Sequence, residues 1–206
     1  MALTPDGCFF VKIMRTIVFI DGQNLYHLAK TAWAATGLAR YTWPSYDAWR
    51  ISEELVARVP GRTLTEVRFY TGVPEPGWPP DSNKFWHGFW TNKLRAMTNQ
   101  GIYVYKGRIS RSGQEKGVDV ALGLDVVQLT HEQRYDCGVI VSQDWDFGPA
   151  ISLAKTIARS QSRNLTFESA FPFDNGNTSP RGIPGTTWVH IDKSLYDSCH
   201  DPKDYR

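Results

Sequence analysis

The stretch that decides the fold runs Thr16-Ile17-Val18-Phe19-Ile20-Asp21-Gly22-Gln23-Asn24-Leu25, an apolar run that ends in a polar turn. Residues 16–20 are all β-branched or aromatic, which is typical of a buried strand. Gly22 allows the backbone to turn sharply, and Asn24 is suited to opening a helix over residues 24–35. The stretch therefore predicts the first strand and the first helix of an α/β fold.

The same alternation of strands and helices continues along the chain, as in a succession of βαβ units. Further strands are predicted at residues 66–70, 102–105, 137–141, 165–170 and 188–191, and further helices at 46–59, 82–98, 118–130 and 147–158. Prolines crowd a stiff loop between residues 74 and 80, and residues 173–185 form a long loop. We expect one domain over residues 16–206 after an N-terminal extension of residues 1–15, which is frayed, or absent if Met14 is the start.

The composition excludes several classes of protein. Of 206 residues, 41% are hydrophobic and 21% are charged, which excludes a disordered chain or a fibre. The 23 Lys and Arg against 21 Asp and Glu give a net charge of +2, too small to coat nucleic acid or a membrane by bulk charge. Cys8, Cys137 and Cys199 lack the paired spacing of metal ligands, and no apolar run is long enough to span a bilayer. We therefore expect a cytoplasmic protein with reduced thiols and no membrane partner.

Three groups of acidic residues fall where a parallel α/β sheet places its active site, at the carboxyl ends of strands. The first is Asp21, which directly follows the strand at residues 16–20, with Asn24 three residues later. The side chain of Asn24 can bond a backbone amide or support a metal ligand. Asp21 and Asn24 can equally cap the first helix, so both interpretations stay open.

The second group is Ser142, Asp144 and Asp146, which follow the strand at residues 137–141. Alternate residues of an extended backbone point to the same side, so these three side chains are expected together. Carboxylates placed this close raise each other's pKa, and a divalent cation removes that cost. Asp146 can instead be the N-cap of the helix at residues 147–158, but this would explain only one of the two aspartates.

The third group is Asp119 with Lys116, at the start of the helix predicted over residues 118–130. An Asp in a first helical turn is stabilised by the helix dipole and needs no other function. Lys116 is placed to hold a phosphate or to neutralise Asp119. Asp125 lies about 120° around the helix from Asp119 and is a secondary candidate.

Three motifs in this order resemble the NYN domain, a PIN-like ribonuclease group, in its LabA-like branch. They are Ile-Asp-Gly-x-Asn-Leu at residues 20–25, Lys-Gly-Val-Asp-Val at 116–120 and Ser-x-Asp-x-Asp-Phe at 142–147. The resemblance covers about residues 16–191. It implies a PIN-like three-layer α/β/α sandwich with a mostly parallel central sheet, in which clustered aspartates bind Mg²⁺ or Mn²⁺ and cleave RNA.

The resemblance also implies roles for individual residues. The catalytic and metal-binding set is Asp21, Asp119, Asp144 and Asp146, supported by Asn24, Ser142 and Lys116. The chain departs from the commonest pattern at Gln143 and Trp145, where smaller residues are usual, and we expect their bulk to narrow the site and to affect substrate preference. One or two hard cations on such oxygen ligands would polarise a phosphate oxygen and activate a water molecule.

A basic and aromatic tract is the expected RNA-binding surface. Residues 83–114 contain no Asp or Glu, but they contain six Lys or Arg interleaved with aromatic residues. Cations contact phosphates and rings stack on unpaired bases, as single-stranded or structured RNA requires. About two thirds of the rings are expected in the core, since they repeat at helical spacing. The expected RNA contacts lie in the polar, flexible segment with Lys106, Arg108 and Arg111, together with Lys116.

Two classes of function fit these observations. The first is a metal-dependent endoribonuclease, and the alternative is a non-catalytic RNA-binding or regulatory adaptor on the same fold. The four aspartates favour catalysis, because a protein that only binds polyanions gains nothing from negative charge facing phosphate. An aspartyl-phosphate phosphatase is disfavoured because Gln23 stands two residues after Asp21, where that chemistry needs an acid. A homodimer stays open for either class.

Overall fold

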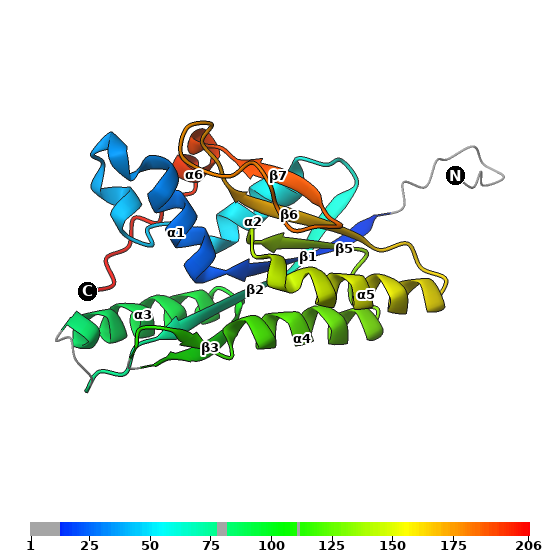
Figure 1. The fold of residues 1–206 in the computed structure, drawn as a ribbon, viewed down its shortest axis with the longest axis horizontal. Helices are drawn as coiled ribbons and strands as arrows, with labels where there is room; N and C mark the ends of the chain where they lie inside the picture. Colours follow the sequence, from blue (N-terminus) through cyan, green and yellow to red (C-terminus); the bar gives the residue numbers. More distant parts are fainter. Residues whose placement is uncertain (1–12, 78–81, 111) are drawn as a thin grey trace.

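The structure, a computed structural model, describes residues 13–77, 82–110 and 112–206, and a seven-stranded sheet forms its centre (Figure 1). The strands are β1 (Met14–Asp21), β2 (Arg62–Val73), β3 (Tyr103–Ile109), β4 (Glu115–Lys116), β5 (Cys137–Val141), β6 (Thr166–Pro172) and β7 (Thr187–Ile191). Their order across the sheet is β4-β3-β2-β1-β5-β6-β7. All neighbouring strands are parallel except β3 and β4. Strand β1, predicted first from the sequence, therefore lies in the middle of the sheet.

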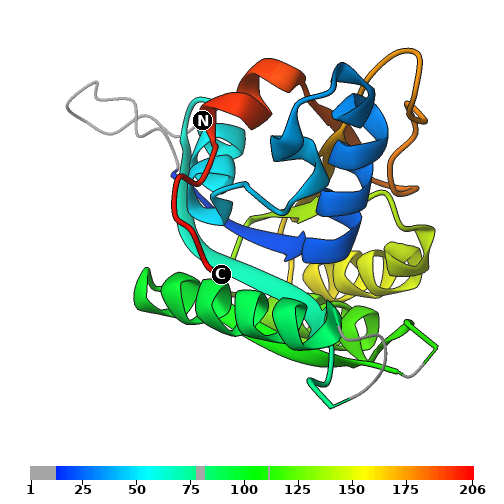
Figure 2. The same ribbon diagram turned by 90° about the vertical axis from the view of Figure 1, so that its left-hand side faces the viewer.

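Helices cover both faces of this sheet (Figure 2). They are α1 (Gly22–Trp33), α2 (Ala48–Ala57), α3 (Ser82–Asn99), α4 (Val118–His131), α5 (Gly148–Ser160) and α6 (Lys193–Ser198), with short 3₁₀ helices η1 (Ala34–Thr36), η2 (Ala39–Thr42) and η3 (Trp145–Phe147). Helices α1, α2, α3 and α6 share one hydrophobic cluster with the sheet, and α4 and α5 share the other. The expected three-layer α/β/α sandwich with a mostly parallel sheet is confirmed.

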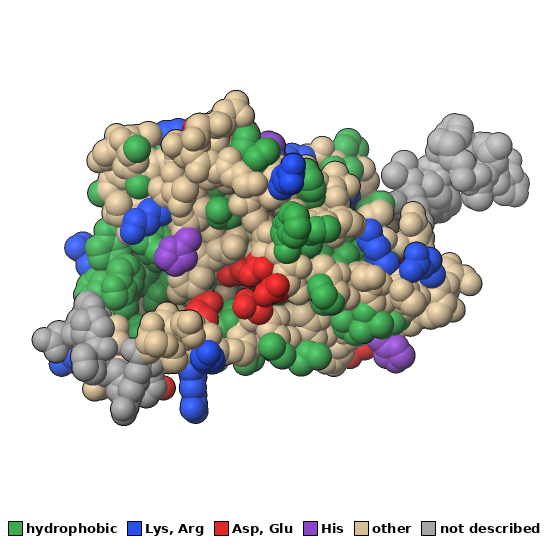
Figure 3. Space-filling model, viewed as in Figure 1, with side chains coloured by type: hydrophobic (Ala, Val, Ile, Leu, Met, Phe, Trp, Pro, Cys, Tyr) green, Lys and Arg blue, Asp and Glu red, His purple; other side chains and the backbone are tan. Residues whose placement is uncertain are grey.

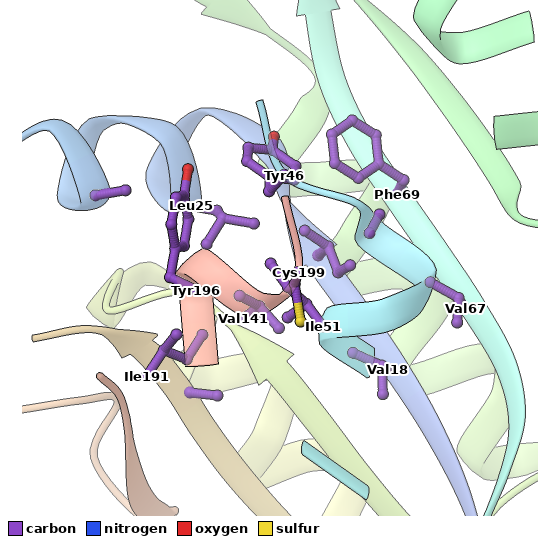
Figure 4. Packing of buried hydrophobic residues seen from close by; sticks show 14 of the residues in the cluster. Val18, Leu25, Tyr46, Ile51, Val67, Phe69, Val141, Ile191, Tyr196 and Cys199 are labelled. Atoms are coloured by element: carbon purple, nitrogen blue, oxygen red, sulfur yellow. The ribbon is translucent and has the colours of Figure 1, made fainter. Parts of the chain in front are cut away.

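Buried side chains of the central strands anchor the helices and fix the edge at which the strands end. Figure 4 shows Val18, Val67 and Val141, from β1, β2 and β5, in one cluster with Leu25 of α1 and Ile51 of α2. Successive residues of a strand face opposite sides, so the intervening positions of β1 pack toward α4 and α5. Because β1, β2 and β5 are parallel, the loops that follow them emerge at the same edge of the sheet.

Several elements differ from the sequence prediction. Strand β2 starts four residues before the predicted strand at 66–70 and ends three residues after it. The short elements β4 and α6 were not predicted, because two and six residues are too few to show a hydrophobic period. Lys106 and Arg108 belong to β3, which pairs with both β2 and β4, so the prediction of a flexible segment is wrong for these two residues.

The start of the chain also differs from its predicted boundary. Strand β1 begins at Met14, so Met14 and Arg15, expected in the extension, pair with β2. Residues 1–12 of the extension, including Cys8, lie outside the described residues, as do Pro79 and Pro80 of the proline-rich loop. In the described ranges, no helix combines the length and hydrophobicity that a membrane span requires.

Candidate functional site

Asp21 ends the central strand β1 and caps the helix that follows it. Its Oδ1 accepts a hydrogen bond from Asn24 N at 3.0 Å, so the capping interpretation is correct. The residue is only 4% exposed. Burial raises the pKa of Asp21 to about 7, the hydrogen bond from Asn24 opposes this rise, and the negative charges of Asp119 and Glu115 add to it. Asp21 is therefore a helix cap that also lies among other carboxylates.

Ser142 and Asn24 connect the end of β1 to the turn after β5. Ser142 is buried, and its Oγ donates to Asp21 Oδ2 at 3.2 Å and accepts from Asp144 N at 3.0 Å. Asn24 Oδ1 accepts from Gln143 N at 3.0 Å. These bonds hold the turn against the N-terminus of α1, and the supporting role of Ser142 and Asn24 at a metal site stays a prediction.

Asp144 and Asp146 lie in that turn, in different structural roles. Asp144 Oδ1 accepts from Asp146 N at 2.9 Å, which makes Asp144 the N-cap of η3. Helix α5 begins at Gly148, with Phe147 at its cap position and no side-chain cap. The alternative that Asp146 caps this helix is therefore wrong, and the side chain of Asp146 is exposed.

Asp119 brings a further carboxylate to this edge from the first turn of α4. The turn into the helix is made by Gly117, whose φ of 80° is a conformation that favours glycine. Desolvation raises the pKa of Asp119, and the negative charges of Asp144 and Asp146 raise it further. Asp119 therefore lies within electrostatic reach of both aspartates of the β5 turn and of Asp21.

Glu115 is an acidic residue at this edge that sequence reasoning missed. It lies in β4, where one carboxylate oxygen accepts a hydrogen bond from Gly72 N. Burial raises the pKa of Glu115 to about 6; the bond from Gly72 lowers it, the charge of Asp119 raises it, and a hydrogen bond from Gln23 lowers it. The sequence signal was its place directly before the Lys-Gly-Val-Asp-Val motif, but only the β3–β4 pairing shows where Glu115 lies. We call Asp21, Glu115, Asp119, Asp144 and Asp146 the acidic site.

Two other residues predicted near Asp119 have separate partners. Lys116 Nζ donates to Gln114 Oε1 at 3.3 Å. Asp125, the secondary candidate, pairs with Arg68 of β2, whose Nη2 lies 2.8 Å from Asp125 Oδ2. Asp125 therefore holds α4 to the sheet and does not belong to the acidic site.

The basic tract is only partly available for binding. Lys93 is 1% exposed, and its Nζ donates to Asp201 Oδ2 at 2.8 Å, so this cation is part of the structure. Lys106 and Arg108 have exposed side chains on β3. Arg111 lies outside the described residues.

The aromatic rings of the tract divide as expected between core and surface. Phe89 and Trp90 are buried, Trp86 and Tyr105 pack against the two core clusters, and Phe85 and Tyr103 are exposed. Four of the six rings therefore belong to the packed interior or its edge, in line with the predicted two thirds.

Contrary to the prediction, the side chain of Gln143 does not narrow the acidic site. Its Nε2 donates to Ser179 O at 2.7 Å and to Arg181 O at 2.9 Å, so the side chain ties the β5 turn to the loop between β6 and β7. Trp145 is 57% exposed. Its effect on substrate preference stays a prediction.

The acidic site fits a hard divalent cation in its donor chemistry. Its members supply carboxylate oxygens, the ligands that Mg²⁺ and Mn²⁺ prefer. Burial is the main cause of the raised pKa of Asp21, and the charges of Asp119 and Glu115, which a bound cation would offset, add to it. However, within residues 13–77, 82–110 and 112–206, no three His, Cys, Asp or Glu side chains converge into a metal-binding group. The residue types are suitable, and binding would require the carboxylates to move closer together.

The surface view shows where these charges lie. In Figure 3, acidic side chains gather near the middle of the face, between α1 above and α4 below. Basic side chains are spread around this face, and a hydrophobic patch lies toward its left edge, over the region between α1 and α3 and apart from the acidic side chains. The negative charge is therefore local, although the whole chain carries a net charge of +2.

Comparisons with known proteins agree with this architecture. The family model described as the NYN domain matches residues 15–160 of the chain. No curated protein matches it. The crystal structure of a protein of unknown function from Vibrio parahaemolyticus is similar, with a TM-score of 0.53 and 18% sequence identity, over 88% of this chain and 95% of that one. At this identity the likeness shows a shared fold.

Proposed function

The chain belongs to the NYN domain family, a family of PIN-like nucleases, and from this premise we propose that it is a metal-dependent endoribonuclease. The reaction would be the hydrolysis of RNA phosphodiester bonds at the acidic site, with Mg²⁺ or Mn²⁺ as cofactor. The proposed catalytic and metal-binding residues are Asp21, Asp119, Asp144 and Asp146, and Glu115 joins them because of its position.

One observation carries the proposal: a buried carboxylate at the carboxyl end of the central strand lies within electrostatic reach of other carboxylates. Asp21 is 4% exposed, yet its pKa is raised further by Asp119 and Glu115. Such an arrangement destabilises the folded chain, since each buried negative charge opposes the next. A stability role alone does not explain it, whereas a bound cation would compensate for the repulsion.

The residues around Asp21 have separate parts in the proposed mechanism. Bound among the carboxylates, the metal would supply a Lewis acid for the phosphate and a more acidic water for in-line attack. Ser142 orients Asp21 through its Oγ, and Asn24 fixes the backbone at Gln143, so the two loops keep their relative position. Lys116, Lys106 and Arg108 would contact RNA phosphates on the β3–β4 side, and we propose the same role for Arg111, which lies outside the described residues.

The alternative is a non-catalytic RNA-binding or regulatory adaptor on the same fold. It is supported by the finding that no three metal-ligand side chains converge among the described residues. The two functions differ in one observable: both predict RNA binding, but only the first predicts metal-dependent cleavage.

The test is incubation of the purified full chain with single-stranded and structured RNA in Mn²⁺, Mg²⁺ or chelator. We expect cleavage with metal, and loss of at least about 100-fold in rate for Asp21→Asn and Asp144→Asn, since removal of an essential electrostatic group costs roughly this much. The matched control is Asp125→Asn, which changes a carboxylate of α4 that pairs with Arg68 outside the site. Binding without cleavage under all conditions would leave the adaptor as the function.

We also propose that the protein works in the cytoplasm. Cys137 and Cys199 are free and buried, as expected where thiols stay reduced. A single domain is part of the same proposal, with its start moved from residue 16 to Met14, where β1 begins; a homodimer is left for solution measurements to decide.

A further inference from the structure

A small aromatic pocket lies beside the acidic site, on the side of α3. Its volume is about 260 Å³, and its lining includes Gln23, Tyr26, Trp86, Trp90 and Ile109. Pockets for drug-sized ligands measure about 300 to 1,000 Å³, so this one suits a single flat ring system. We call it the aromatic pocket.

The pocket adjoins the acidic site at two of its lining residues. Gln23, directly after the turn at Asp21 and Gly22, lines the pocket. Ile109, also in the lining, is the residue opposite Glu115 in the β3–β4 pair. A molecule in the pocket would therefore lie one side chain away from the carboxylates.

The aromatic walls are held in fixed positions. Trp90 is 4% exposed and packs against Phe69 of β2, with ring centroids 6.2 Å apart. Trp86 is half-buried and packs against Trp43 at 5.0 Å. Tyr26 is fixed by a hydrogen bond from its hydroxyl to a backbone carbonyl at 2.9 Å. Rigid rings lose little entropy when a flat ligand stacks on them, so the pocket is preorganised.

The polar groups of the pocket match the edge of a nucleobase. Gln23 lines the pocket, and its side-chain amide has a carbonyl oxygen that accepts hydrogen bonds and an NH₂ that donates them. Every RNA base carries an N–H on its pairing edge that such an oxygen can accept. The exposed cations Lys84 and Arg108 flank two further lining residues, Asn83 and Ile109, in sequence.

We infer that the aromatic pocket binds one unpaired nucleobase of the RNA, next to the phosphate that a cation bound at the acidic site would contact. This inference rests on the proposed function, because it takes RNA as the ligand of that site. The half-buried Trp86 supplies the stacking surface, the buried Trp90 forms the floor beneath it, and Gln23 contacts the base edge. The pocket thereby selects RNA that presents an unstacked base, as single strands and loops do.

The test measures binding separately from cleavage. Fluorescence anisotropy follows labelled single-stranded hexanucleotides on the full chain in chelator, with either all bases present or one abasic residue at each position in turn. For Trp86→Ala we expect affinity for intact RNA to fall roughly 5- to 150-fold, the range given by stacking energies of about 1–3 kcal/mol per base. For wild type, an abasic residue at one position of the RNA should lower the affinity by a similar factor. For Trp86→Ala, the same abasic residue should lower the affinity little further.

Control variants separate stacking from folding. Trp86→Phe keeps a ring and should retain most of the affinity, while Trp86→Leu keeps apolar bulk without a ring and should lose it. Trp188→Ala removes another partly exposed Trp, on the edge strand β7, and should bind RNA like wild type. The inference is overturned if folded Trp86→Ala and Trp86→Leu bind RNA as tightly as wild type. It is also overturned if an abasic residue at each position lowers the affinity of these variants as much as it lowers that of wild type.

The outcomes also distinguish this inference from the proposed function. RNA binding that depends on Trp86 and on the base at one position, without cleavage in any metal, would support the base pocket and contradict the nuclease proposal. Metal-dependent cleavage by wild type, with unchanged RNA affinity in Trp86→Ala, would support the nuclease proposal and contradict the base pocket. Absence of any RNA binding by wild type would overturn the inference itself.

Discussion

Replacing Asp21 by Asn should stabilise the metal-free protein at pH 8, although Asp21 caps a helix. A carboxyl group whose pKa is raised in the folded state favours folding while it is protonated. This stabilisation is complete below the ordinary pKa near 3.8 and is lost as the pH rises toward the folded value of about 7. Above pH 7, the folded chain therefore carries the full penalty of a buried charge, and Asp21→Asn removes it.

The size of the effect follows from the same values. The interval from 3.8 to about 7 corresponds to roughly 4 kcal/mol, at about 1.4 kcal/mol for each pKa unit. An amide still accepts from Asn24 N, and its NH₂ can donate to Ser142 Oγ; the loss of the bond between Asn24 N–H and the charged carboxylate is already contained in the folded pKa, which that bond lowers. We expect Asp21→Asn to be more stable than wild type by roughly 4 kcal/mol at pH 8, with the difference disappearing toward pH 4.

Guanidinium unfolding in chelator, followed by far-ultraviolet circular dichroism at pH 5, 6, 7 and 8, measures this difference. Asp125→Asn is the control with the opposite sign, because it breaks the pairing with Arg68 and should destabilise the chain at all four pH values. The reasoning is refuted if Asp21→Asn is no more stable than wild type at pH 8, or if the difference between them does not change with pH. Asp21 would then act mainly as a cap.

Two further predictions concern the interior. Asp201→Asn should lower the free energy of unfolding at pH 7 by about 3 kcal/mol, because it leaves the buried ammonium of Lys93 without its negative partner. Burial raises the pKa of Asp201, but the charge and hydrogen bond of Lys93 outweigh this effect, so the pKa lies below its ordinary value. The contribution of Asp201 to wild-type stability is therefore present above about pH 4 and is lost as the pH falls. Urea titrations in which wild type and Asp201→Asn lose stability equally in acid would contradict this prediction. Gly22→Ala would place its Cβ 2.5 Å from the ring of Phe69, so we expect the free energy of unfolding to fall by about 1–3 kcal/mol and RNA cleavage to slow. A variant with unchanged stability and cleavage rate would show that the turn can accommodate a methyl group.

Much of the fold could be predicted from periodicity, because the elements that matter are long or uniformly apolar. Strand β5 has the predicted bounds, since its five residues are all buried and no polar residue blurs its ends. Strand β2 extends beyond its prediction because its first residues alternate between half-buried and exposed, a pattern that a search for an apolar core overlooks. Its added length provides Gly72, whose N–H binds Glu115.

Those residues of the candidate site whose position depends on a single strand or helix could be predicted from the sequence. Asp21 and Asp144 were expected at strand ends because position after a strand can be read from the local sequence. Glu115 was missed because its place depends on a two-residue strand that exists only through pairing with β3. Lys93 was assigned to the surface because its partner Asp201 is 108 residues away, and a pattern within one helix does not reveal such a partner.

The order of the strands gives the acidic site a place in the folding of the chain. Asp21 and Ser142, which share a hydrogen bond, are 121 residues apart, and Glu115 joins them only after β2 and β3 have paired and β4 has added to the edge. Contacts of such long sequence separation form late, since large loops must close first. The acidic site is therefore assembled only in chains whose sheet is complete from β4 to β5, and a nascent or partly refolded chain would carry every carboxylate without the arrangement that brings them together.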